Sequence, residues 1–248
     1  MNKNDFILEL KDWGQYFTPF FNSSKGKEFI INFNKHLSNF NDIFKCFQLT
    51  PPKNIKIIWQ GVEPFLDETS DGLCFSSVDN INPSTKVIFE AIAESTNIPF
   101  KDFNLKEGLS YLSEQGILLL NKNLTVAKGK PLSHTKIWEG FNQYFFNIIK
   151  EKFPHVSIVV FGQKALPLDI VFDKNNPLYV LKHPIFCIKN KIKLDLNRTF
   201  ILINDYLRTH FNWAITYNYA LWEEKKQDMF NDPEADVIKM MDDFKLPF

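Results

Sequence analysis

Each of four short apolar runs in the sequence is followed by a polar or turn-forming group. In chain order, these groups are Glu63, Asn121, the pair Gly162-Gln163, and His183. A carboxylate, an amide and an imidazole are side chains that stabilise charge and fix the orientation of a polar ligand. If the fold brings them together, they indicate a binding or catalytic site.

Taken one at a time, these residues also have structural explanations. A lone Glu63 after a strand is often a solvated loop residue, and Asn121 could cap or turn its loop. His183 precedes Pro184 and could be structural, while Phe75 is most simply a core residue. The functional interpretation therefore depends on whether the surrounding elements place these side chains at one edge.

The four apolar runs predict β-strands. They are nearly apolar throughout and do not alternate, which is typical of parallel strands that are covered on both faces. The predicted strands are 55–59, 117–120, 156–161 and 178–181. Because ligands bind beyond the carboxyl ends of the strands in open parallel sheets, we expect the four groups to gather at one edge of one sheet.

Helical patterns lie between these strands. Asn82 and Pro83 open one of them, as N-cap and first helical residue. Two more cover 134–150, which carries one apolar stripe, and 199–211. The N-terminal part of the chain, around Trp13, also has helical patterns. Strands that alternate with helices are typical of an α/β fold, so we predict three layers, α/β/α, around a central four-stranded, mainly parallel sheet.

The chain contains no internal repeat and no low-complexity linker. We therefore expect a single domain over residues 1–213. Residues 214–248 have the pattern of an appended C-terminal helix and acidic tail, through which a protein partner could bind. This division rests on composition alone.

The composition is that of a soluble globular protein, with 44% hydrophobic and 23% charged residues among 248. The formal net charge is zero, so no global basic field indicates nucleic acid, although lysine clusters leave a local basic face open. The three cysteines lie far apart and the five histidines lack ligand spacing, which argues against a disulfide scaffold or a metal site. No apolar run approaches the roughly 18 residues of a membrane span. We expect an intracellular, cytoplasmic monomer without bound metal.

Six ordered blocks between Trp13 and Trp213, among them QGILLLNKNLTV, LKHPIFCI and IIWQGVEPF with DGLCFSS, together resemble the family-1 uracil-DNA glycosylases. IIWQGVEPF with DGLCFSS is similar to that family's strand, its GQDPYH water-activating loop and its GLxFS block. QGILLLNKNLTV resembles GVLLLNxxLTV, and SHTKIWEGF resembles SHxxxGWExF. VVFGQKA, LKHPIFCI and TFILINDYL with a later NW are similar to LLWGSxA, AxHPSPLS and HFxxxNxxLxxxxxxxIDW. The resemblance implies the fold of that family and a DNA glycosylase that needs no metal or cofactor.

The resemblance implies that four residues contact the base. Phe75 would stack on a base flipped out of the DNA, and Asn121 would make a two-point contact that distinguishes uracil from cytosine. Phe65 takes the place of a Tyr that crowds the C5 position and excludes thymine. Val62 replaces a Gln whose backbone contacts the base.

Two further residues would act on the bond that breaks. Cleavage leaves positive charge on the sugar and negative charge on the base, which a carboxylate and a preorganised donor stabilise. By the resemblance, His183 would stabilise the anionic O2 of the departing base. Glu63 occupies the position of the family's Asp, which favours the cationic sugar and aligns the attacking water. Glu is one methylene longer, and a displacement of about 1 Å at a reacting centre lowers a rate roughly 100-fold.

The loops that would clamp DNA are altered more. Gln163 replaces a Ser of the family, and Cys187 stands where a Leu wedges into the minor groove, with Phe186 as a possible substitute. Lys189 and its neighbouring lysines could attract phosphates. The resemblance implies DNA contacts for Pro83, Ser84, His134, Gly162, Gln163, Phe186, Cys187 and Lys189.

Three functions remain open from the sequence. The first is excision of uracil, as in base excision repair, which leaves an abasic site in the DNA. The second is removal of a modified pyrimidine, such as hydroxymethylated or glucosylated cytosine, from foreign DNA in antiviral defence, although Phe65 would collide with a large C5 group. The third is a catalytically impaired relative that binds DNA or a protein partner. Glu63, Val62 and the altered clamp loops motivate the second function, and the acidic tail and the loss of the family's Asp motivate the third.

Overall fold

The structure is a computed structural model in which the N-terminal four-fifths of the chain are described almost continuously. The described residues are 1–37, 42–67, 69–77, 82–103, 105, 108–167, 175–208 and 211–214. The predicted C-terminal helix and acidic tail, apart from Ala214, lie outside the described residues. The division into 1–213 and 214–248 therefore stays a prediction.

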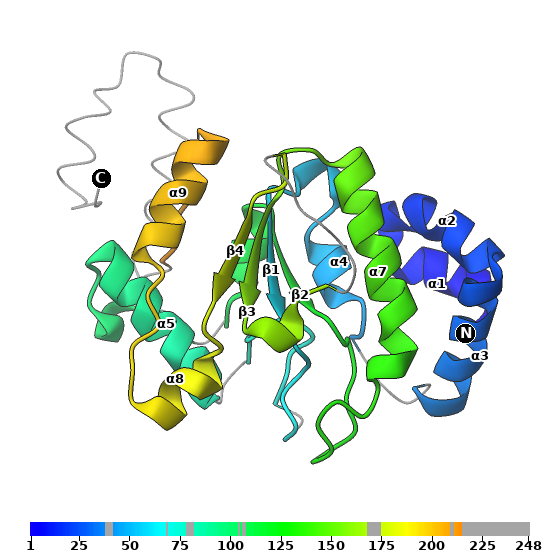
Figure 1. The fold of residues 1–248 in the computed structure, drawn as a ribbon, viewed down its shortest axis with the longest axis horizontal. Helices are drawn as coiled ribbons and strands as arrows, with labels where there is room; N and C mark the ends of the chain where they lie inside the picture. Colours follow the sequence, from blue (N-terminus) through cyan, green and yellow to red (C-terminus); the bar gives the residue numbers. More distant parts are fainter. Residues whose placement is uncertain are drawn as a thin grey trace.

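A four-stranded sheet forms the centre of the fold, as predicted (Figure 1). Its strands are β1 (Ile57–Gly61), β2 (Ile117–Asn121), β3 (Ser157–Phe161) and β4 (Leu178–Leu181). Their order is β2-β1-β3-β4, and every pairing between them is parallel. Such an order puts β1 at the point where the chain changes direction across the sheet, which is where ligands bind in folds of this kind.

The strand boundaries differ slightly from the prediction. The first strand begins at Ile57 and not at position 55, because Ile55 still caps a short 3-10 helix over Pro52–Asn54. At their other ends, β1 and β2 continue through Gly61 and Asn121. These two residues are therefore strand residues and not part of the following loops.

The expectation that all strands are covered on both faces is wrong for β4. Every residue of β1, β2 and β3 is buried, whereas residues along β4 alternate between exposed and half-buried. Leu178 is 36% exposed and Val180 is 50% exposed. Edge position alone does not explain this, because β2 at the other edge is fully buried. The difference is cover: α4 (Lys45–Leu49) and α6 (Ser110–Glu114) pack against β2, whereas β4 has its main contacts with β3 among the described elements.

Helices cover both faces of the sheet, as Figure 1 shows. On one side lie α5, α8 and α9, and on the other lies α7, with the N-terminal helices packed outside it. The bounds are α1 Lys3–Glu9, α2 Gly14–Asn22, α3 Ser24–His36, α4 Lys45–Leu49, α5 Pro83–Thr96, α6 Ser110–Glu114, α7 Thr135–Lys152, α8 Pro184–Asn190 and α9 Asn197–Leu207. The predicted three-layer architecture is confirmed, and Asn82 caps α5 with Pro83 as its first residue, as predicted.

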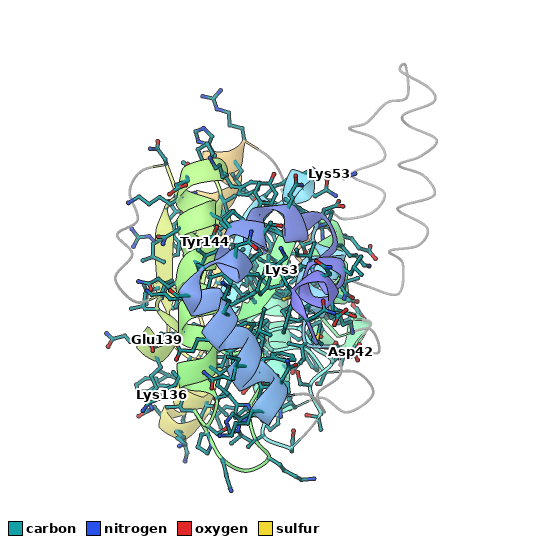
Figure 2. The ribbon with its side chains drawn as sticks, turned by 90° about the vertical axis from the view of Figure 1, so that its right-hand side faces the viewer. Lys3, Asp42, Lys53, Lys136, Glu139 and Tyr144 are labelled. Atoms are coloured by element: carbon teal, nitrogen blue, oxygen red, sulfur yellow. The ribbon has the colours of Figure 1, made fainter. Side chains whose placement is uncertain are left out.

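Aromatic side chains join α7 to the N-terminal helices. Phe17 stacks on Phe141 with ring centroids 4.5 Å apart, and Trp13 meets Phe145 edge-on at 5.5 Å. Tyr144 lies on the same stripe, and Figure 2 shows its place along α7 behind the N-terminal helices. Such ring pairs add about 0.5–1.5 kcal/mol each beyond the area they bury. The packing fixes α7, whose first turn borders the candidate site.

A second aromatic group closes the opposite face of the sheet. Trp59 of β1, Phe200 of α9 and Trp213 lie nearly parallel, with Phe200 and Trp213 only 3.9 Å apart. Trp213 also receives a hydrogen bond at its carbonyl from the Tyr111 hydroxyl, at 2.8 Å.

Within the described part of the chain, no helix is both long and apolar enough to cross a membrane.

Candidate functional site

The carboxyl ends of β1 and β2 place the first two candidate residues side by side. Gly61 is directly opposite Asn121 in the parallel register. The pairing continues past the strands, because the N–H of Lys122 donates to the Gly61 carbonyl and the N–H of Asn123 donates to the Val62 carbonyl, both at 2.9 Å. The loop that carries Glu63 is therefore held in register with the end of β2.

Asn121 and Phe75 meet at Gly61. A Cβ atom on Gly61 would lie 2.9 Å from Asn121 Oδ1 and 3.2 Å from the Phe75 ring. Asn121 is only 5% exposed and Phe75 only 6%. Among the residues that the structure describes, the Asn121 side-chain amide has no hydrogen-bond partner, which is unusual for a nearly buried polar group. An unpaired amide beside an aromatic ring is suited to a flat, polar ligand.

Phe75 is held in a conformation that few side chains adopt. Its φ is +59°, in the left-handed region, which costs a non-glycine residue about 1–3 kcal/mol. The Thr85 hydroxyl donates to its carbonyl at 2.7 Å. Its ring meets Phe161 edge-on at 5.0 Å and His183 at 5.5 Å. The surrounding contacts thus fix the ring between β3 and the start of α8.

His183 is the N-cap residue of α8. The hydrogen bond that it accepts there determines which ring nitrogen carries the proton in the neutral form. The Ile185 N–H donates to His183 Nδ1 at 3.2 Å, so the ring proton of the neutral form lies on Nε2. Burial lowers the pKa of His183, which favours this neutral form. Gly162, with φ +85°, permits the close approach, since a Cβ there would lie 3.0 Å from the His183 Cβ. His183 therefore presents an Nε2–H donor near Phe75.

Glu63 lies half-buried just beyond β1. Both of its carboxylate oxygens accept the main-chain N–H of Leu132, at 3.1 and 2.9 Å. Burial raises the pKa of Glu63, and hydrogen bonds from Leu132 and the Asn123 side chain, with the charge of Lys164, oppose that rise. The structure thus gathers a carboxylate, an amide and an imidazole, three of the four groups expected there, at one sheet edge. Gly162 of the fourth group lies against His183, and the Phe75 ring lies beside Asn121.

Val62 and Phe65 lie in the same segment. Val62 is half-buried against the core and is tied to β2 through its carbonyl. Phe65 is half-buried in the irregular segment that follows β1. That Val62 and Phe65 contact the base stays a prediction. Phe65 lies two residues beyond Glu63 in the chain.

The residues predicted to contact DNA differ in exposure. Pro83, Gln163 and Lys189 are exposed, and Gly162 is half-buried, while Ser84 is 2% exposed with its N–H bonded to Asn82 Oδ1 at 3.0 Å. His134 is half-buried ahead of α7, with Nδ1 3.0 Å from the Thr125 hydroxyl, and burial lowers its pKa.

Cys187 requires a correction. The structure buries its side chain to 1% exposure, because α8 turns this residue toward the core. A thiol in that position does not reach DNA in this conformation. The neighbouring Phe186 is 51% exposed and Ile188 is 41% exposed, so apolar side chains of α8 other than Cys187 are available at this surface.

Sequence reasoning missed two residues beside Glu63, Leu132 and Asn123, and one contact across the sheet edge, made by Lys122. Leu132 supplies its N–H from a backbone at φ +60°, and nothing in the sequence marks that contact. Lys122 ties β2 to the segment after β3, with Nζ 2.7 Å from the Leu166 carbonyl. Asn123 is two residues after Asn121, and Glu63 is two residues after Gly61. Because Gly61 and Asn121 are paired in the sheet, the strand register could have identified Asn123 as a neighbour of Glu63.

Within the described residues, no group of three or more His, Cys, Asp or Glu side chains could hold a metal ion.

No protein-family model matches the chain. The uracil-DNA glycosylase of Mycoplasmopsis pulmonis is 35% identical over 186 residues, which cover 70% of this chain and 80% of that protein. That of Azobacteroides pseudotrichonymphae is 30% identical over 220 residues, covering 84% and 97%.

The fold has known relatives as well. The crystal structure of mimivirus uracil-DNA glycosylase superposes with a TM-score of 0.70 at 18% identity, over 84% of this chain and 86% of the other. The likeness of the two structures supports the fold, while the identity to the bacterial proteins over most of their length supports descent. Together they show that the chain belongs to the uracil-DNA glycosylase family.

Proposed function

We propose that this DNA glycosylase excises uracil from DNA and leaves an abasic site. The observation that carries the proposal is the Asn121 amide, which is nearly buried and has no hydrogen-bond partner within the described residues. It lies beside the Phe75 ring at Gly61. Bacterial relatives that bear the name uracil-DNA glycosylase support the same conclusion.

Recognition begins when the target nucleotide leaves the DNA stack, because its glycosidic bond is otherwise out of reach. The flipped base would stack on Phe75. The Asn121 amide would donate to uracil O4 and accept from uracil N3–H. Cytosine presents the opposite pattern, an amino group and an unprotonated N3, so in this orientation of the amide both of its polar atoms would be left unpaired. Such a mismatch typically costs several kcal/mol in a desolvated site.

Phe65 accounts for the exclusion of thymine in this proposal. Its ring is half-buried two residues beyond Glu63, where it would face the C5 edge of a stacked base. A methyl group at C5 would then overlap the ring, and overpacking of this kind costs about 1–3 kcal/mol. Larger C5 groups would be excluded more strongly.

Bond cleavage needs no proton transfer to the base. As the bond between the base nitrogen and C1′ breaks, its electron pair leaves with the base, and the sugar becomes cationic. The His183 Nε2–H would donate to the anionic O2, while the Glu63 carboxylate stabilises the cation. A water held by Glu63 then adds to C1′, and the water proton passes to the carboxylate or to solvent.

The proposal is tested with duplex oligonucleotides that carry one uracil, cytosine, thymine or 5-hydroxymethylcytosine, followed by alkaline cleavage of abasic sites. We expect strand breaks at uracil alone. Asn121→Ala should lower the single-turnover rate by about 100-fold or more while leaving the melting temperature nearly unchanged. Breaks at 5-hydroxymethylcytosine without breaks at uracil would overturn the proposal, as would DNA binding without breaks on any substrate.

A further inference from the structure

The strand register places Asn123 beside Glu63. Gly61 pairs with Asn121, and the main-chain bonds of the next two residues continue that pairing. Position 63 therefore falls opposite position 123, two residues beyond the pair that faces the base. Because Asn123 N–H donates to the Val62 carbonyl at 2.9 Å, its Cα cannot move independently of the Glu63 loop.

The Asn123 side chain is buried and only partly paired. It is 1% exposed, and its Nδ2 donates to the Thr135 hydroxyl at 2.9 Å, in the first turn of α7. Its Oδ1 is buried and has no hydrogen-bond partner in the described part of the chain. An unpaired buried carbonyl costs about 1–3 kcal/mol, so an apolar residue of similar size would be cheaper for folding alone.

The orientation of this amide is explained by the carboxylate. Turning the amide over would point Oδ1 at Thr135, whose hydroxyl can donate, but it would also change which amide atom faces Glu63. In the observed orientation Nδ2 carries a second N–H in addition to the one that it gives to Thr135. That donor lies close enough to Glu63 to lower the pKa of the carboxyl. The observed orientation thus leaves Oδ1 unpaired and keeps an N–H of the amide on the side of the Glu63 loop.

We propose that Asn123 is a positioning residue that anchors the Glu63 carboxylate to the first turn of α7 through Thr135. The role rests on the proposed function, since it assigns Glu63 to the reacting sugar. Leu132 holds the carboxylate from one side by its N–H, and Asn123 holds it from the β2 side. Together the two groups would hold the carboxylate of the longer Glu63 side chain in one position.

The groups that face Glu63 come from three segments. The N–H of Leu132 belongs to the loop before α7, the amide of Asn123 follows β2, and the charge of Lys164 comes from the 3-10 helix Gln163–Ala165. Of these three groups, the Asn123 amide is the one that an apolar substitution can remove without a change of charge. Its loss should raise the pKa of Glu63 and loosen the carboxylate.

The test compares Asn123→Leu with Ser157→Ala. Ser157 is also fully buried with an unpaired hydroxyl, but it lies at the opposite end of the sheet, as the first residue of β3. The Glu63 carboxyl is titrated by ¹³C NMR of Glu-labelled protein, with Glu63→Gln to assign the signal. We expect a higher pKa of Glu63 in Asn123→Leu, no change in Ser157→Ala, and a melting temperature that does not fall in Asn123→Leu.

Kinetics provide the second readout. On uracil-containing DNA, Asn123→Leu should lower kcat by about 10- to 100-fold with KM within about twofold, and should have no further effect in a Glu63→Gln background. Thr135→Val should shift the Glu63 titration in the same direction by less, and it replaces Asn123→Leu if that variant does not fold. An unchanged titration in both variants, or an equal kcat loss in the Glu63→Gln background, would overturn the proposal. If the wild-type protein cleaves no substrate, the proposed function fails while the titration still decides the role of Asn123.

Discussion

The Glu63 carboxylate accepts the main-chain N–H of Leu132, 69 residues further along the chain, with both oxygens within 3.1 Å of the nitrogen. A backbone donor thus determines where the longer side chain ends. The contact also explains the backbone of Leu132, whose φ of +60° is rare for a branched residue. The loop before α7 is therefore part of the site, although none of its side chains was predicted to reach Glu63.

Leu132→Gly tests whether the backbone alone matters here. Glycine adopts a φ near +60° without strain, so the roughly 1 kcal/mol of strain removed should offset its larger loss of entropy on folding. The N–H that binds Glu63 is retained. We expect stability within about 1 kcal/mol of wild type and excision within about threefold, measured by denaturant unfolding and single-turnover kinetics. A loss of 10-fold or more would instead assign a role to the 41% exposed leucine side chain.

The pH dependence of excision should follow Glu63 on its acid side. Because burial raises the pKa of this carboxyl above its ordinary value of 4.5, the ionised form is lost before an exposed Glu would be protonated. The rate should therefore fall as pH drops through this raised pKa. Native-state stability responds in the opposite sense, since a group whose pKa is higher in the folded state stabilises that state as it takes up its proton.

Glu63→Gln separates these two effects. We expect a rate reduced by about 100-fold or more, without the acid limb of the wild-type profile, and a melting temperature at neutral pH that is equal or higher. His183 should not add a limb above pH 7, because burial moves its pKa below 6.5. An acid limb that persists unchanged in Glu63→Gln would contradict the assignment of that limb to Glu63.

Gly61 offers a test of the base contacts. A methyl group there would lie 2.5 Å from the Cys74 sulfur as well as close to Asn121 and Phe75. Gly61→Ala should cost about 1–3 kcal/mol of stability and abolish excision. Adding Cys74→Ala should restore much of the stability but not the activity, because the contacts with Asn121 and Phe75 remain. Recovery of activity in the double variant would show that Gly61 acts only through packing.

Phe186 and Cys187 form a matched pair for DNA binding. Phe186→Ala removes an exposed ring, so it should weaken binding to uracil-containing DNA several-fold while changing stability by less than about 0.5 kcal/mol. Cys187→Ala removes a buried group, so it should lower stability by about 1 kcal/mol and leave DNA affinity unchanged. Fluorescence anisotropy and thermal unfolding measure the two effects. The reverse assignment would mean that α8 rearranges on DNA.

Much of the fold followed from simple patterns in the sequence. Uninterrupted apolar runs located all four strands, and the Asn82-Pro83 signal located the start of α5, because both depend on local chemistry. The exposure of β4 could not be predicted, since its residues are as apolar as those of the buried strands. Exposure there depends on which helices cover each edge of the sheet, which is a property of the whole fold.

The site was predictable where residue type and strand position agreed. Glu63, Asn121 and His183 each follow a strand end, so the parallel sheet brings them to one edge. Leu132 could not be found in this way, because its contribution is a backbone N–H and the sequence does not encode its φ in a recognisable residue type. The burial of Cys187 was also missed, because it depends on how α8 packs and not on its neighbours in the chain.

Identification of the released base tests the central claim most directly. The protein is incubated with duplex DNA that contains a single uracil, and the small-molecule fraction is analysed by mass spectrometry beside the same reaction with Glu63→Gln and Asn121→Ala. We predict free uracil in an amount equal to the abasic sites formed, and very little from either variant. Release of another base, or abasic sites that form equally in the wild type and both variants, would contradict the account.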